Sequence, residues 1–100
     1  GTNTNPATTI TISSSGVSPK TLTVTRGTQV TMLNTDSRTH QEASDPHPAH
    51  DECPELNTWG TLSNGQSRQS SNLNTARTCG YHDHDNPSST AFQGTIIIQP

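Results

Sequence analysis

All five histidines of this 100-residue chain fall in two short segments. The first segment runs from His40 to His50 and also contains His47, and the second contains His82 and His84. Five of the eight acidic residues surround the first segment, and no lysine or arginine lies between positions 39 and 67. Imidazole and carboxylate groups gathered without cations of their own favour a divalent metal ion, because the ion supplies the missing positive charge. If the fold brings the two segments together, the sequence predicts a metal site.

The composition predicts one small domain with a thin core. Apolar residues make up 24% of the chain, and the net charge is only −3. The polarity comes mainly from Thr, Ser and Asn rather than from charge, and threonine suits the solvent face of a strand. A weakly negative chain lacks the Lys and Arg patches that nucleic acid requires, so we expect no nucleic-acid partner. No apolar run is long enough to span a membrane.

Short apolar alternations between turn signals predict an all-β domain. Ile10 and Ile12 alternate with Thr, and so do Leu22 and Val24. Strands at short, regular spacing are typical of an antiparallel sandwich or a small barrel. The segment 41–59 has little strand character and contains three prolines, so it is predicted to be a long functional loop. Residues 66–73 are so polar that they predict either an exposed edge strand or a face covered by a second copy of the chain.

The only two cysteines, Cys53 and Cys79, each lie at the edge of a histidine segment. A disulfide between them would tie the loop of the first segment to the strand of the second. The alternative is a pair of free thiols, one of which binds metal. A disulfide implies an oxidising compartment, so the sequence predicts a periplasmic, cell-surface or secreted protein. Residues 1–8 are predicted to be a linker or flexible N-terminus, and residues 9–99 form the single domain.

The order of the signals resembles the plastocyanin-like cupredoxin family. The resemblance rests on Val17-Ser-Pro-Lys-Thr-Leu-Thr-Val-Thr-Arg-Gly-Thr-Gln-Val-Thr-Met32, followed by Asn34-Thr-Asp36 and then His40. Leu62 to Gly65 resembles the family's L-x-x-G turn, and Gly94-Thr-Ile-Ile-Ile resembles its closing strand. The resemblance covers residues 9–99 and implies a cupredoxin-like Greek-key β-sandwich or barrel. Trp59 and Tyr81 are expected to be core residues rather than redox relays.

Departures from the family pattern predict a site of another kind. Tyr81-His-Asp resembles the family's Y-x-C strand end, so Asp83 stands where a blue copper protein has its cysteine ligand. Asn86 stands in place of the second histidine, and no methionine lies near Ser89, so only His40 keeps its ligand identity. A blue copper site needs the copper–thiolate bond. The sequence therefore predicts no blue colour and no electron transfer of that type.

Strand geometry and the resemblance together suggest how the histidines group. Alternate residues of a strand point to opposite faces, so an inward Asp83 places His82 and His84 on the outer face. In the family's fold, the segment after His40 runs beside that outer face. The first choice is therefore a site of His47, His50 and His82 with His84 as a fourth ligand. A second grouping, of His40 with Asp83 or His84 near the family's ancestral position, stays open.

Three or four imidazoles without a thiolate suit Cu(II), with Zn(II) as the alternative. We therefore expect an exported copper-binding protein with a histidine-rich, type 2-like site that serves copper capture, delivery or tolerance. One alternative is a small type 2 copper enzyme acting on oxygen, superoxide or nitrite. Another is a structural surface domain with incidental metal binding. A homodimer, and a membrane tether through an N-terminal segment absent from this sequence, also stay open.

Overall fold

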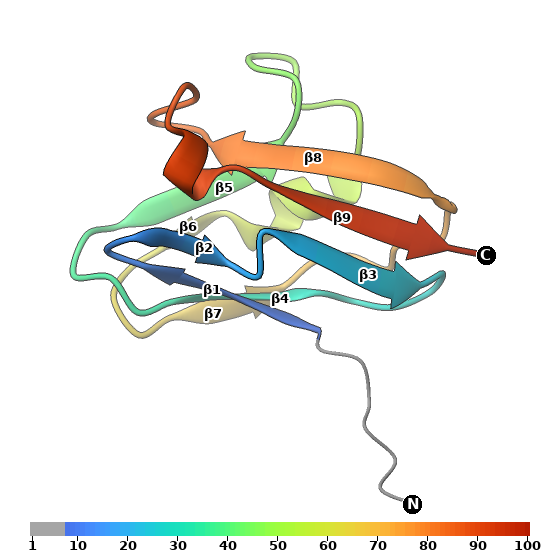
Figure 1. Ribbon diagram of the computed structural model, residues 1–100, viewed down its shortest axis with the longest axis horizontal. Coiled ribbons are helices and arrows are strands. Elements are labelled where there is room, and N and C mark those ends of the chain that lie inside the picture. The colour runs from blue at the N-terminus through green and yellow to red at the C-terminus, as the bar shows by residue number, and fades with distance from the viewer. Residues whose placement is uncertain (1–7) are drawn as a thin grey trace, which may run out of the picture.

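The computed structural model describes residues 8–100, over which the strands form two facing sheets (Figure 1). The four-stranded sheet has the order β2-β1-β4-β7 and contains β1 (Thr9–Ser13), β2 (Gly16–Ser18), β4 (Thr31–Asn34) and β7 (Ser67–Gln69). The five-stranded sheet has the order β3-β9-β8-β5-β6 and contains β3 (Thr21–Thr25), β5 (His40–Ser44), β6 (Thr61–Leu62), β8 (Arg77–Asp83) and β9 (Gly94–Gln99). The prediction of an all-β sandwich is confirmed. The predicted linker lies, except for Thr8, outside the described residues.

Two strand pairs are parallel, although the sequence predicted an antiparallel sandwich. Strand β1 pairs with β4, and β3 pairs with β9, each in parallel register. The parallel pairs arise because the chain crosses between the sheets: β1 and β2 belong to one sheet, β3 to the other, and β4 returns to the first. Short alternating runs in the sequence fix which residues face inward, but they carry no information about the direction of a neighbouring strand.

The core lies between the two sheets and follows the predicted alternation. Strand β3 alternates strictly between exposed and buried residues, with Leu22 and Val24 inward. Trp59 and Tyr81 are buried, as predicted, and their rings meet edge to face at 5.5 Å. The indole Nε1 of Trp59 donates a hydrogen bond to the Val30 carbonyl at 2.9 Å. A buried indole N–H normally needs such a partner.

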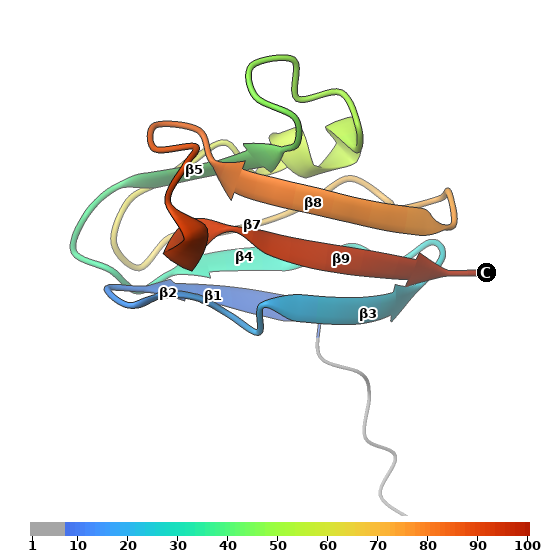
Figure 2. The same cartoon turned by 45° about the horizontal axis from the view of Figure 1, so that its top comes forward.

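The predicted loop 41–59 is only partly a loop. Residues 40–44 form β5, which pairs with β8 on one side and β6 on the other. A 3-10 helix, η1 (Pro54–Trp59), buries Leu56 and Trp59 against the core. Strand β5 was missed because it lacks apolar alternation, and its place depends on the hydrogen-bond ladder with β8. The true loop is 45–53, which rises above the five-stranded sheet beside β8 (Figure 2).

The remaining segments are short. A second 3-10 helix, η2 (Thr90–Phe92), precedes β9 and buries Phe92. Within the polar segment 66–73, β7 is an edge strand whose residues are all exposed in the single chain, whereas Ser70 and Leu73 are buried. Within the described range, no helix has the length and apolar character needed to cross a membrane.

Candidate metal centre

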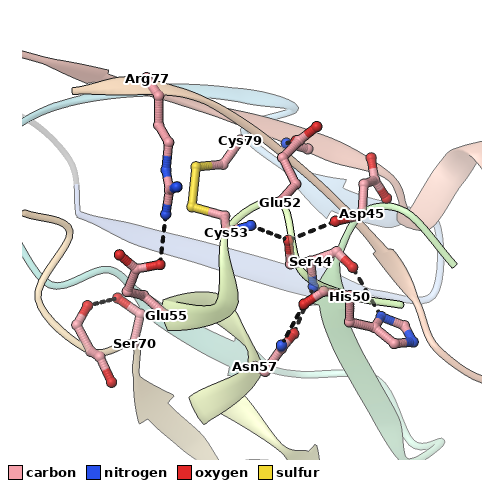
Figure 3. Close-up of a disulfide and its surroundings, with 12 residues drawn as sticks. Ser44, Asp45, His50, Glu52, Cys53, Glu55, Asn57, Ser70, Arg77 and Cys79 are labelled. Atoms are coloured by element: carbon pink, nitrogen blue, oxygen red, sulfur yellow. Dashed lines mark hydrogen bonds and ion pairs between the residues drawn. A yellow bond between two sulfur atoms is a disulfide. The ribbon is translucent and has the colours of Figure 1, made fainter. Parts of the chain in front are cut away.

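A disulfide anchors the loop 45–53 to β8. Cys53 and Cys79 are bonded to each other, as predicted, and both are completely buried. The backbone N–H of Cys53 also donates to Oγ of Ser44 at 2.7 Å, which joins the end of the loop to the end of β5. Figure 3 shows Ser44 hydrogen-bonded to both Cys53 and His50. The two ends of the loop are therefore held over the same part of the sheet.

The orientation of His50 is fixed by the surrounding backbone. Its Nδ1 lies 2.9 Å from the carbonyl oxygen of Ser44, which can only accept, so Nδ1 carries the proton. Its own carbonyl accepts a hydrogen bond from Nδ2 of Asn57 at 2.8 Å (Figure 3). These bonds hold His50 at a φ of 54°, a left-handed conformation that non-glycine residues seldom adopt. Its Nε2 therefore carries a lone pair, which accepts a hydrogen bond from Nδ1 of His84 at 3.1 Å in the metal-free molecule and can bind a metal ion in its place.

Three imidazoles converge at the top of the loop. Ligand nitrogens of His47, His50 and His84 all lie within 4.8 Å of one another. Nδ1 of His84 is 3.1 Å from Nε2 of His50. Two nitrogens bound to one ion at about 2.0–2.1 Å lie about 2.8–3.4 Å apart when the angle at the metal is about 90–110°. The His50–His84 pair therefore already has the spacing of two ligands of one ion.

His82 lies beside this group but deeper. Its ring centroid is 4.9 Å from that of His50 and 5.4 Å from that of His47. It comes from β8, where it faces Ala43 across the ladder, and it is only 3% exposed. Its Nδ1 is 2.6 Å from a carboxylate oxygen of Asp45. Its buried Nε2 has no hydrogen-bond partner among the described residues.

The crowding of the imidazoles lowers the pKa of His47. Desolvation is the largest cause, followed by repulsion from the charged forms of His50, His82 and His84. A histidine whose pKa is lowered stays neutral, and therefore able to bind metal, at a more acidic pH than a free one.

His40 lies apart from the group and has different neighbours. Its two ring nitrogens are hydrogen-bonded to carboxylates, Nε2 to Asp36 at 2.7 Å and Nδ1 to Asp83 at 3.0 Å. Its ring stacks on Phe92 at 4.7 Å. The hydrogen bond from His40 is the main reason why the pKa of Asp36 falls to about 2. His40 and Asp83 do meet, as the second predicted grouping required, but as a hydrogen-bonded pair with both nitrogens of His40 engaged.

The acidic residues near the histidines have three different roles. Asp45, Asp36 and Asp83 do bind imidazole nitrogens. Glu52 instead accepts a bond from the backbone of Gly80, and Glu55 pairs with Arg77. These two carboxylates stabilise the attachment of the loop to β8.

Glu42 is a feature that the sequence did not reveal. It is 2% exposed, and neither carboxylate oxygen has a hydrogen-bond partner among the described residues. Desolvation, and after it the charge of Asp83, raises the pKa of Glu42 to about 9. The side chain is therefore neutral at pH 7. No motif signalled this, because Glu42 looked like one more carboxylate near the histidines.

A pocket of about 410 Å³ opens next to this site, bordered by Lys20, Thr21 and Thr95. Asp45 and Gly80 also line it, so Asp45 separates the pocket from His82. The hollow therefore lies behind Asp45 and not over the converging imidazoles.

Comparisons with known proteins place the fold. No protein-family model matches the chain, and no curated protein sequence matches it. Among solved structures, a purple cupredoxin from Nitrosopumilus maritimus is similar at 19% identity with a TM-score of 0.70, over 91% of this chain and 98% of that one. Oxidised plastocyanin from Dryopteris crassirhizoma is similar at 18% identity and a TM-score of 0.70, over 91% and 99% of the two chains. The Cu(I) form of an amicyanin mutant matches at 18% identity and a TM-score of 0.69, over 93% and 82%. The fold is therefore cupredoxin-like.

Proposed function

We propose that this domain captures copper at a non-blue site made of His47, His50 and His84, with His82 as a fourth ligand. The observation that carries the proposal is the convergence within 4.8 Å of two imidazoles from the disulfide-fixed loop, those of His47 and His50, with that of His84, which follows β8. The ligand set is neutral, and the acidic residues of the loop supply the negative charge around it. The captured copper is either delivered to another protein or held to make the cell tolerant of copper.

The cysteine chemistry supports a non-blue site. The chain has only two cysteines, and both are in the disulfide, so no thiolate is left to bind copper. Imidazole sites of this kind prefer Cu(II) to Zn(II) in the affinity order of divalent metals. The disulfide also supports an oxidising compartment, namely the periplasm, the cell surface or the medium.

Titration of the metal-free protein with Cu(II), followed by EPR and visible absorption, tests the proposal. We expect one equivalent to bind with a nitrogen-rich type 2 signal and without the intense blue absorption of a copper–thiolate bond. A parallel titration with Zn(II) gives the metal preference. A blue band would show that a cysteine is a ligand. Weak binding without defined stoichiometry would leave a structural surface domain.

The affinity for Cu(II) is expected to fall in acid, because protonated imidazole cannot bind metal. A histidine of ordinary pKa, about 6.5, would begin to lose metal near that pH. Since the pKa of His47 is lowered, this residue should stay neutral and able to bind metal at a somewhat lower pH than a histidine of ordinary pKa. Isothermal titrations between pH 8 and pH 4 measure the profile. Undiminished affinity at the acid end would contradict imidazole ligation and indicate carboxylate ligands.

A further inference from the structure

Asp45 occupies a fixed position between the loop and β8. Its backbone N–H donates to the carbonyl of Gly80 at 3.0 Å, and its own carbonyl accepts from the N–H of Glu52 at 3.0 Å. The hydroxyl of Ser44 donates to that same carbonyl at 2.9 Å. Hydrogen bonds thus hold both the N–H and the carbonyl of Asp45, so the backbone from which its side chain extends is fixed at the edge of the sheet.

Gly80 provides the space for the carboxylate. A Cβ atom added to Gly80 would clash with Oδ2 of Asp45 and lie 3.2 Å from its Cγ. Any side chain at position 80 would therefore displace the Asp45 carboxylate. Nothing in the backbone requires glycine here, since Gly80 lies within the regular strand β8. The absence of a side chain is explained by the close approach of Asp45.

The other carboxylate oxygen sets the tautomer of His82. Oδ1 of Asp45 lies 2.6 Å from Nδ1 of His82, and an ionised carboxylate can only accept, so the proton is on Nδ1. Nε2 then carries a lone pair. That atom is buried and has no hydrogen-bond partner among residues 8–100, while its ring lies 4.9 Å from that of His50. A buried lone pair on a ring next to His50 is suited to add a fourth ligand to the group of His47, His50 and His84, whose nitrogens lie within 4.8 Å of one another.

We infer that Asp45, seated against Gly80, is a positioning residue that holds His82 with Nε2 ready to bind the metal ion as the innermost ligand. The inference rests on the proposed function for its metal, but the tautomer of His82 can be tested without metal. Carboxylates that orient a metal-binding histidine in this way also raise its basicity, and their loss typically lowers metal affinity 10- to 100-fold.

The first test uses the metal-free wild-type protein. Long-range ¹H–¹⁵N correlation spectra should show His82 protonated at Nδ1 and unprotonated at Nε2. In the variants Asp45→Ala and Gly80→Ala, we expect the Nδ1-protonated form to lose its predominance. A wild-type His82 protonated at Nε2 would overturn the inference, whether or not the protein binds copper.

The second test measures Cu(II) affinity with matched variants. Asp45→Ala is expected to lower the affinity 10- to 100-fold at unchanged stoichiometry, and Asp45→Asn, which keeps an acceptor oxygen, less. Gly80→Ala should act like Asp45→Ala although it removes no polar atom. Asp51→Ala removes an exposed carboxylate from the same loop and should change the affinity no more than a few-fold.

A double-mutant cycle separates positioning from simple charge. In a His82→Ala background, Asp45→Ala should have almost no further effect, because the group that it positions is gone. If Asp45→Ala and Asp51→Ala weaken binding equally, or if the Asp45 and His82 effects add, the inference fails while copper capture stands. If the wild type binds no copper stoichiometrically, the proposed function fails, and the tautomer measurement still decides the role of Asp45.

Discussion

Replacing Glu42 by glutamine is expected to stabilise the metal-free protein by about 3 kcal/mol at pH 7 and by more at higher pH. Glu42 is buried without a hydrogen-bond partner among the described residues, and its pKa is raised from 4.5 to about 9. The neutral amide resembles the protonated carboxyl in size and charge. The two proteins should therefore have similar stability near pH 4 and diverge as the pH rises.

The direction of this pH dependence follows from the number of protons that the folded and the unfolded states bind. Between about pH 4.5 and pH 9, the folded protein holds a proton on Glu42 that the unfolded chain has released. Folding then takes up a proton, so the stability contributed by this group is complete below pH 4.5 and declines as the pH rises towards 9. The decline amounts to roughly 1.4 kcal/mol per pH unit. Glutamine does not titrate and removes this dependence.

Urea denaturation of both proteins between pH 4 and pH 9, with a chelator present, measures the difference in free energy of unfolding. Asp51→Asn is the matched control, since it makes the same change from carboxylate to amide at an exposed position. If the control shows the same pH-dependent gain, net charge and not burial is the cause. A constant difference between Glu42→Gln and the wild type would contradict the raised pKa.

The apolar strands could be predicted because the alternation of apolar and polar residues along each strand shows which side chains are buried. Ile10, Ile12, Leu22 and Val24 alternate with threonine, and all four are buried. The predicted grouping of histidines on the outer face required one further assumption. If the side chain of Asp83 points inward, those of its neighbours along β8 point outward. In the structure Asp83 bonds to His40, while His84 lies against His50.

Features that depend on cross-strand register could not be predicted. Strand β5 places Glu42 opposite Asp83 and Ala43 opposite His82, and no local pattern encodes that pairing. The burial of Glu42 follows from this register, as does the contact between Asp45 and Gly80. His40 has the same residue type as the family's ligand, yet its two ring nitrogens are hydrogen-bonded to Asp36 and Asp83. A residue type alone does not show whether a histidine has a free lone pair.

Replacing His50 or His84 by alanine is expected to lower Cu(II) affinity by about 100- to 1000-fold. A structural zinc site with four ligands typically contributes about 10–16 kcal/mol, so one ligand accounts for about 3–4 kcal/mol. These two residues already lie 3.1 Å apart, and His50 is held by Ser44, so little ordering is needed when metal binds. His47 is exposed, and water can take its place, so His47→Ala should cause a smaller loss.

His40→Gln is the control that separates the outer-face site from the ancestral position of the fold. Its side chain can still reach one carboxylate, but both nitrogens that face Asp36 and Asp83 are removed. We expect this variant to unfold at lower urea concentration and to bind Cu(II) with unchanged affinity in competition with a chromophoric chelator. If His40→Gln abolishes binding while His50→Ala and His84→Ala do not, copper binds between the sheets and the loop histidines have another purpose. The opposite result would mean that this cupredoxin-like fold binds its metal on the outer face, through a loop held by the disulfide.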